Sequence, residues 1–269
     1  MRVTGSEKLQ EAFPEGRAAL VPYLTAGYPT LEGAREVGEA YLEAGADIVE
    51  IGVPFSDSLT DGPVIQNTNI RALENGANLG YCLGLASDFA DQVPVVLLTS
   101  YNIVFARGVE RFLDDATGAG VSGLVIPDLP IDEAEGFRET AAERGVAICP
   151  LAAPTTTDDR LDRIAKAASG FVYCVSVAGV TGARKKLPPA AIELLRRARA
   201  RVSVPVALGF GISSAKAAVE AAAEADGVII GSKLMQIVAE EGPEGAGRWL
   251  RGVRAALDRE GSVKAGSRD

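Results

Sequence analysis

The sequence predicts a single α/β domain built as a closed (β/α)8 barrel with extra helices, and three observations lead to this prediction. Short β-rich apolar runs alternate along the chain with amphipathic segments that favour helix, as expected for parallel strands joined by crossover helices. Eight such runs are present, which is the strand number of a TIM barrel. No Pro/Gly/Ser-rich linker separates the units, so residues 1–269 are expected to form one TIM-barrel domain.

Each predicted strand is a short run rich in β-branched or other apolar side chains. The expected strands are residues 19–25, 47–52, 93–99, 123–126, 146–151, 171–176, 204–209 and 227–230. The amphipathic segments between them are residues 31–44, 110–116, 132–144, 158–168, 190–200 and 215–225. Extra helices are expected at residues 6–13, before the first strand, and at 78–91, within the second βα unit. The polar tail GSVKAGSRD, residues 261–269, is expected to be flexible.

Charge and hydropathy exclude several classes of protein. The formal net charge of -9 argues against a basic surface that follows a nucleic-acid backbone. No stretch of about 18 consecutive apolar residues is present, and the first residues, MRVTGSEKLQEAF, lack the apolar core of a signal peptide, so neither membrane spanning nor export is expected. Cys82, Cys149 and Cys174 are odd in number and form no C-x-x-C pair, which predicts reduced thiols in a cytoplasmic protein.

The chain contains no histidine. Its absence excludes Ser-His-Asp and Cys-His catalysis and every histidine-based metal site. Three scattered cysteines cannot form a thiolate metal cluster, so we expect neither a metal nor a cofactor. Proton chemistry would then depend on carboxylates and tyrosines.

Two acids occur together in the segment ADIVEIGVPFSDSLTDGPVIQ, residues 46–66. Glu50 lies at the C-terminal end of an expected strand, and Asp61 follows in the next loop, where barrel enzymes carry their reactive groups. If Glu50 points inward, burial raises its pKa and allows general-acid chemistry near neutral pH. Alternatively, Glu50 only forms hydrogen bonds in the barrel mouth, and Asp61 is a common turn residue before glycine.

Two glycine-rich turns predict a phosphate site. GFGIS, residues 209–213, begins at the end of the seventh expected strand, and IIGSKL, residues 229–234, contains the end of the eighth. Glycines let backbone N–H groups approach phosphate oxygens, and the Ser232 hydroxyl can add a donor at the start of a helix. Either glycine turn alone could simply reflect a tight strand-to-helix connection, but the pair occupies the place where barrels often bind phosphate.

The segment VSVAGVTGARKKLP, residues 175–188, is the longest polar loop that follows an expected strand. Its glycines would permit a lid that closes over a ligand, and its basic residues, 184–186, would attract an anion. The alternative is a solvated approach to the next helix.

Five motifs together carry a family resemblance. The segment GADIVEIGVPFSDSLTDGPVIQ, with LVPYLTAGYPT, VIPDLP, AGVTGAR and GFGIS, resembles the tryptophan synthase alpha chain over nearly the whole sequence. The resemblance implies a cofactor-free retro-aldol cleavage of indole-3-glycerol phosphate to indole and glyceraldehyde 3-phosphate, in L-tryptophan biosynthesis. It also implies that Glu50 protonates indole C3 and accepts the glycerol hydroxyl proton, and that Asp61 binds the indole N–H.

The same resemblance implies roles for other residues and a partner. Tyr173 would lie beside the general acid, and Phe210 would pack on the indole ring. Gly182, Gly211, Gly231 and Ser232 would surround the phosphate. Thr25 and Asp128 would lie near the active-site loop, which closes when Thr181 reaches Asp61. The expected partner is a pyridoxal-phosphate β chain, which receives indole through a tunnel in an α2β2 complex.

Several positions depart from the family pattern. Ser58 and Thr60 replace proline and alanine in the usual S-D-P-L-A-D-G loop, which meets the β chain, and Val177 stands where many alpha chains have arginine. Losing the proline makes one loop shape entropically more costly to hold. Two alternatives therefore stay open: a stand-alone lyase that makes free indole for another pathway, and a non-catalytic regulatory alpha-like subunit. A barrel acting on another sugar phosphate fits the 46–66 segment less well.

Overall fold

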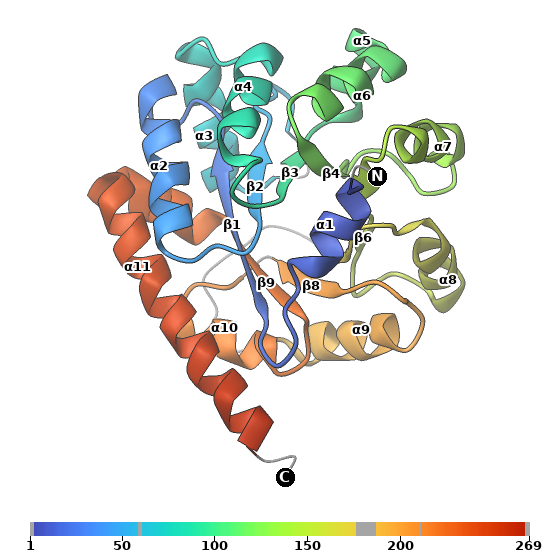
Figure 1. The fold of residues 1–269 in the computed structure, drawn as a ribbon, viewed down its shortest axis with the longest axis vertical. Coiled ribbons are helices and arrows are strands. Elements are labelled where there is room, and N and C mark those ends of the chain that lie inside the picture. Colours follow the sequence, from blue (N-terminus) through green and yellow to red (C-terminus); the bar gives the residue numbers. More distant parts are fainter. Residues whose placement is uncertain (1–2, 59–60, 176–186, 210, 267–269) are drawn as a thin grey trace.

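The computed structural model describes residues 3–58, 61–175, 187–209 and 211–266, with side chains described as far as residue 261. Helices surround a curled sheet of parallel strands (Figure 1). The strands are β1 (Ala19–Thr25), β2 (Val49–Gly52), β3 (Val95–Leu98), β4 (Val121–Val125), β5 (Ala147–Ile148), β6 (Leu151–Ala152), β7 (Val172–Val175), β8 (Val206–Gly209) and β9 (Gly227–Ile230). Their order in the sheet is β5-β4-β3-β2-β1-β9-β8-β7-β6.

The two ends of this sheet order meet at residues 149 and 150. The Cys149 N–H donates to Leu124 O at 2.9 Å, which continues the ladder to β4. On the other side, Pro150 O accepts a hydrogen bond from Tyr173 N at 2.9 Å, which continues the ladder to β7. The single strand predicted at 146–151 is therefore split into β5 and β6, because Pro150 has no N–H to donate. The barrel prediction is confirmed, with this strand interrupted.

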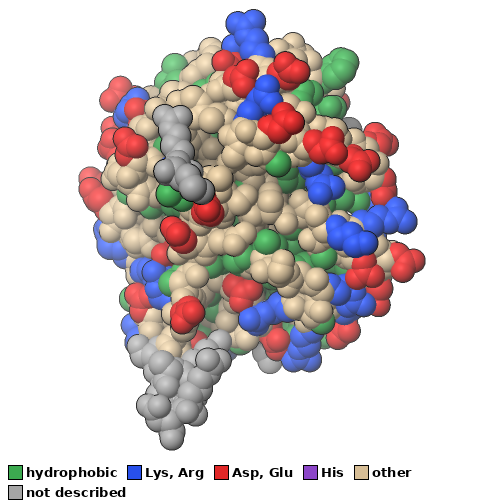
Figure 2. Space-filling view, turned by 45° about the vertical axis from the view of Figure 1, so that its right-hand side comes forward, with side chains coloured by type: hydrophobic (Ala, Val, Ile, Leu, Met, Phe, Trp, Pro, Cys, Tyr) green, Lys and Arg blue, Asp and Glu red, His purple; other side chains and the backbone are tan. Residues whose placement is uncertain are grey.

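Eleven helices are described: α1 (Gly5–Glu11), α2 (Leu31–Glu43), α3 (Pro63–Glu74), α4 (Leu79–Phe89), α5 (Tyr101–Arg107), α6 (Val109–Gly118), α7 (Glu135–Glu143), α8 (Asp158–Ala167), α9 (Pro189–Arg199), α10 (Ala215–Ala222) and α11 (Ser232–Gly266). Both predicted extra helices are present, as α1 and α4. No described helix is long and apolar enough to cross a membrane. Acidic and basic side chains are interspersed over the face shown in Figure 2.

Three helices were not predicted. Gly62 and Pro63 suggest a loop in the sequence, but proline fits the first position of a helix, and α3 begins there. Ser100 caps α5, its hydroxyl accepting from Asn102 N at 3.2 Å. In α11 the backbone turns at Gly242, where φ is 70° and ψ is -172°, so the helix axis kinks at GPEG. This helix continues to Gly266, into the segment predicted to be flexible.

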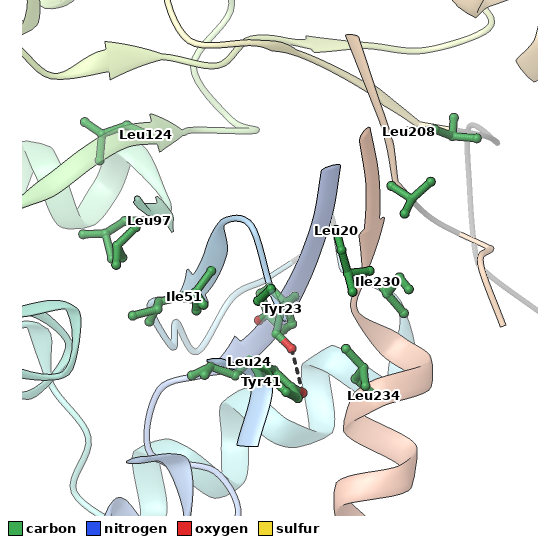
Figure 3. Packing of buried hydrophobic residues seen from close by; sticks show 14 of the residues in the cluster. Leu20, Tyr23, Leu24, Tyr41, Ile51, Leu97, Leu124, Leu208, Ile230 and Leu234 are labelled. Atoms are coloured by element: carbon green, nitrogen blue, oxygen red, sulfur yellow. Dashed lines mark hydrogen bonds between the residues drawn. The ribbon is translucent and has the colours of Figure 1, made fainter. Parts of the chain in front are cut away.

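Side chains pack in two clusters, one inside the barrel and one between the sheet and the helices. The inner cluster includes Val21, Ile48 and Val96 from the strands, and Leu9 from α1. A hydrogen bond of 2.7 Å from Gly5 N to Gly145 O places α1 over the N-terminal end of the barrel. The outer cluster surrounds the sheet with leucines and isoleucines and includes buried Tyr41 of α2 (Figure 3). A functional site is therefore expected at the opposite, C-terminal end of the barrel.

A buried ion cluster joins both ends of the chain to β2. Asp47 accepts two hydrogen bonds of 2.7 Å from Arg17 and one of 3.0 Å from Arg254 on α11. Its Oδ2 also accepts from Leu20 N at 2.8 Å. Only 14% of the Asp47 side chain and 11% of the Arg254 side chain are exposed. This cluster fixes the start of the strand that carries Glu50.

Candidate active site

Glu50 points into the barrel mouth from β2. Ile48 belongs to the inner cluster, and side chains alternate along a strand, so Glu50 shares the inward face. Its side chain is buried, with the residue only 2% exposed. Burial, and then the nearby charge of Asp61, raises the pKa of Glu50 to about 8. Within the described part of the chain, its buried Oε1 has no hydrogen-bond partner.

Asp61 is held by α3. The Asp61 N–H donates to Ser58 O at 3.1 Å, which closes a turn. Gln66 Nε2 donates to the carbonyl oxygens of Asp61, at 2.9 Å, and of Ser58, at 3.3 Å. Asn69 Nδ2 donates to the Asp61 carboxylate at 3.2 Å. Burial raises the pKa of Asp61 to about 6, while the Asn69 hydrogen bond opposes the shift.

Two tyrosines cross the mouth of the barrel above glycines at the strand ends. Tyr173, on β7, is buried, and a Cβ on Gly209 of β8 would overlap its ring. Tyr23, on β1, pairs in register with Glu50 of β2, and a Cβ on Gly52 would overlap its hydroxyl. Burial raises the pKa of both tyrosines above the ordinary value, so both stay protonated. Sequence reasoning identified Tyr173 but missed Tyr23.

Beside Asp61 lies a pocket of about 140 Å³. Its polar lining comes from Gly211, Ser213 and residues 231–233, with Tyr23, Asp61 and Gln236. Its apolar lining is Val64, Ile65, Leu98, Ile212 and Ile229. Glu50 and Tyr173 are not among the described lining residues and lie buried next to it.

The pocket contains the two turns predicted to hold phosphate. Gly211 has φ of 85°, a conformation that favours glycine. Gly231 O accepts from Met235 N at 3.1 Å, so the first N–H groups of α11, from Ser232 onward, have no partner within the helix. Free N–H groups at the positive end of a helix attract an anion. The structure therefore brings Gly211, Gly231 and Ser232 together in one pocket with Asp61.

Other predicted residues lie elsewhere or outside the described chain. Asp128 is exposed, and its carboxylate accepts from Ser100 Oγ and, at 2.8 Å, from Tyr101 N, at the start of α5. Thr25 is fully buried and bonds to Tyr23 and Thr68. Thr181, Gly182 and Phe210 lie outside the described residues, as do Thr60 and Val177. The contact between Thr181 and Asp61 stays a prediction.

Sequence reasoning missed the residues that position Asp61. Gln66 and Asn69 lie on α3, where only knowledge of the helix would place both amides toward the preceding loop. Lys233 and Gln236, one and four residues after Ser232, face the pocket from the first turns of α11. A search for polar residues in the first turn after each strand-end glycine would have found Lys233.

The site has the parts of an acid–base catalyst next to an anion site. Two carboxyl groups share one barrel mouth, and their environments give them pKa values of about 8 and about 6. At neutral pH one is mainly protonated and the other mainly ionised, which is the usual basis for assigning an acid and an anionic partner. Among the described residues, no group of three or more Cys, Asp and Glu side chains could hold a metal ion.

Comparison with known proteins identifies the family. The family model for the tryptophan synthase alpha chain matches residues 9–255. The chain belongs to the tryptophan synthase alpha chain family. Within it, the alpha chain of Synechococcus elongatus is 45% identical over 249 residues, which cover 91% of this chain and 94% of that protein.

Solved structures of this family agree with the fold. A chain of tryptophan synthase from Mycobacterium tuberculosis superimposes with a TM-score of 0.88 at 36% identity, covering 93% of this chain and 98% of that one. A chain from the tryptophan synthase α2β2 complex of Pyrococcus furiosus, studied for mutual activation, gives a TM-score of 0.83 at 40% identity, covering 90% and 98%. The family and the barrel predicted from the sequence motifs are both confirmed.

Proposed function

We propose that this chain cleaves indole-3-glycerol phosphate to indole and glyceraldehyde 3-phosphate, as the alpha subunit of tryptophan synthase in L-tryptophan biosynthesis. Family membership supports the reaction. The observation that carries the proposal is the pair of carboxyl groups, buried Glu50 and partly buried Asp61, beside the pocket that contains the α11 N-terminus. The chemistry requires one proton donor, one anion and one phosphate site, and these parts supply them.

In the proposed reaction, Glu50 acts as both acid and base. Its raised pKa keeps it protonated near pH 7, so it can transfer a proton to indole C3. The C–C bond between indole and glycerol then breaks, with its electron pair returning to the ring. The Glu50 carboxylate takes the proton of the glycerol hydroxyl as the carbonyl forms, so the enzyme ends in its starting protonation state.

Asp61 has the complementary role. Protonation at C3 places positive charge on the indole nitrogen, and an ionised carboxylate there stabilises the charge as it develops. The pKa of about 6 leaves Asp61 mainly ionised at neutral pH. Its hydrogen bonds from α3 hold it in place before substrate binds, so little reorganisation is needed.

The remaining site residues are proposals of the same kind. Gly211, Gly231 and Ser232 would bind the phosphate with Gly182, and Lys233 at the pocket edge adds a positive charge. Tyr173 would lie beside Glu50, and Phe210 would pack on the indole ring. Thr181 would close the lid on Asp61, with Thr25 and Asp128 supporting the loops around it.

The proposed partner is a tryptophan synthase β chain, in an α2β2 complex like that of the Pyrococcus furiosus relative. As a biosynthetic enzyme with reduced thiols, the chain would act in the cytoplasm. Ser58 favours one alternative, a stand-alone lyase, because it replaces a proline in the loop that would meet the partner. Its carbonyl is nonetheless held by Gln66 and Asp61, so the turn is formed without that proline.

One assay separates these possibilities. Purified chain is incubated with indole-3-glycerol phosphate, and indole is measured with and without an added β chain. The proposal predicts indole release that the β chain increases strongly. High release unaffected by the β chain would indicate a stand-alone lyase. Absence of indole in both reactions would contradict the proposed activity.

A further inference from the structure

Three buried hydroxyl groups form a chain that runs from the active-site pocket into α3. Tyr23 Oη lies 3.1 Å from Thr25 Oγ1, and Thr25 Oγ1 lies 2.8 Å from Thr68 Oγ1. Thr68 Oγ1 in turn donates to Ile65 O at 2.9 Å. Thr25 and Thr68 are 0% and 3% exposed, so water does not compete for these bonds.

The carbonyl at the end of the chain sets the direction of every proton in it. A hydroxyl group has one hydrogen to donate, and a carbonyl oxygen can only accept. Thr68 uses its hydrogen on Ile65 O, so it must accept from Thr25. Thr25 then has no hydrogen left, so it must accept from Tyr23. The Tyr23 proton therefore points toward Thr25, and its oxygen has only lone pairs to offer to other groups.

The position of Tyr23 determines which groups can donate a hydrogen bond to its hydroxyl oxygen. At one end of the side chain, a Cβ on Gly231 would lie 3.5 Å from the ring, beside the start of α11. At the other end, the hydroxyl reaches Gly52 on β2, two residues after Glu50. Tyr23 thus spans the distance between the proposed phosphate site and the two carboxyl groups. A substrate that joins phosphate to indole would place its glycerol segment along this side chain.

We propose that Tyr23 is a substrate-contacting residue whose hydroxyl oxygen, oriented by Thr25 and Thr68, accepts a hydrogen bond from a hydroxyl group of the substrate's glycerol chain. This inference rests on the proposed function, because the substrate defines the donor. Thr25 and Thr68 are positioning residues that act through Tyr23. Burial raises the pKa of Tyr23 and keeps its proton in place, so Tyr23 selects a donor and does not itself supply a proton.

The test compares two ligands that differ in these hydroxyl groups. Wild type and Tyr23→Phe are assayed for kcat/KM with indole-3-glycerol phosphate, and for inhibition by 3-(indol-3-yl)propyl phosphate, which lacks both glycerol hydroxyls. Tyr23→Phe is expected to lower kcat/KM about tenfold, the scale of one lost hydrogen bond. Its inhibition constant for the propyl phosphate is expected to stay within about twofold of wild type, because that ligand has no glycerol hydroxyl that could donate to Tyr23.

Other outcomes overturn the inference in different ways. Equal losses for both ligands would mean that Tyr23 only packs in the pocket, and no change for either would mean that it does not contact the glycerol chain. If wild type itself releases no indole, the proposed function fails, whereas normal wild-type turnover with an unaffected Tyr23→Phe variant removes only this inference.

A second pair of variants tests the positioning role. Thr25→Val keeps the side-chain shape but removes the acceptor, which frees the Tyr23 proton to turn toward the pocket. It should lower kcat/KM several-fold for the substrate and leave propyl phosphate inhibition unchanged. Thr25→Ser restores a hydroxyl and should recover activity to within about twofold, because the oriented hydrogen bond is re-formed. Equal loss in both variants would indicate a packing role for Thr25 and contradict the oriented chain.

Discussion

Replacing Glu50 with glutamine is expected to flatten the dependence of stability on pH. A carboxyl group whose pKa is higher in the folded protein than in the unfolded chain favours folding while it is protonated. That stability is fully present below the unfolded pKa and is lost as pH rises toward the folded pKa. For Glu50 this interval runs from 4.5 to about 8. In Glu50→Gln the amide side chain carries no charge at any pH, so this loss disappears.

The size of the effect follows from the shift. One pKa unit corresponds to about 1.4 kcal/mol, so the rise from 4.5 to about 8 amounts to roughly 5 kcal/mol in full. Integrated between pH 5 and pH 8 only, the share from Glu50 is roughly 3 kcal/mol. Asp61, whose pKa rises from 3.8 to about 6, adds roughly 1 kcal/mol in the same interval. The Glu50 contribution is a large part of the free energy of unfolding, which is roughly 5–15 kcal/mol in typical folded proteins.

Urea unfolding at pH 5 and pH 8, followed by circular dichroism, measures this difference. Between the two pH values, the free energy of unfolding should fall by roughly 3 kcal/mol more in the wild type than in Glu50→Gln. Glu139→Gln is the matched control, because it removes an acid from an exposed position on α7 and should behave as wild type. If the free energy of unfolding falls equally in wild type and Glu50→Gln between pH 5 and pH 8, Glu50 is not a buried, protonated group.

Two further variants test the phosphate site and the ion cluster around Asp47. Ser232→Ala removes a donor at the start of α11 and should raise KM about fivefold with little change in kcat, because phosphate is bound alike in the ground and transition states; an unchanged KM in steady-state assays would remove Ser232 from the site. Arg254→Met leaves the buried Asp47 with Arg17 as its remaining arginine and should lower the free energy of unfolding by about 2 kcal/mol in urea. Exposed Arg251→Met is its control, and equal stability of the two would contradict the role of the ion cluster.

The strands could be predicted because each is a short apolar run in a barrel that buries both faces of its sheet. Residues 19–25 and 227–230 were predicted with the bounds that the structure has. The split between β5 and β6 depends on where Pro150 falls in the ladder, which composition does not indicate. Helix α3 was missed because Gly62 and Pro63 are equally typical of a loop and of a helix start.

Site residues could be predicted from the sequence where short local motifs indicate their chemistry. Glu50 lies near a recognisable strand end, Asp61 and Ser232 follow such ends, and the structure places all three at one end of the barrel. Tyr23 and Thr68 were missed because their roles come from contacts between elements distant in the sequence. Thr68 reaches Thr25 only because α3 packs beside β1, a relation that no spacing in the sequence reveals.

The proton transfer by Glu50 is tested by the turnover of Glu50→Gln with indole-3-glycerol phosphate, measured together with the affinity of the variant for 3-(indol-3-yl)propyl phosphate. Indole release is expected to fall by at least about 10²-fold, the scale of a general acid–base contribution, while affinity for the propyl phosphate stays near that of wild type. Turnover equal to wild type, at equal affinity, would contradict the claim that Glu50 carries the proton.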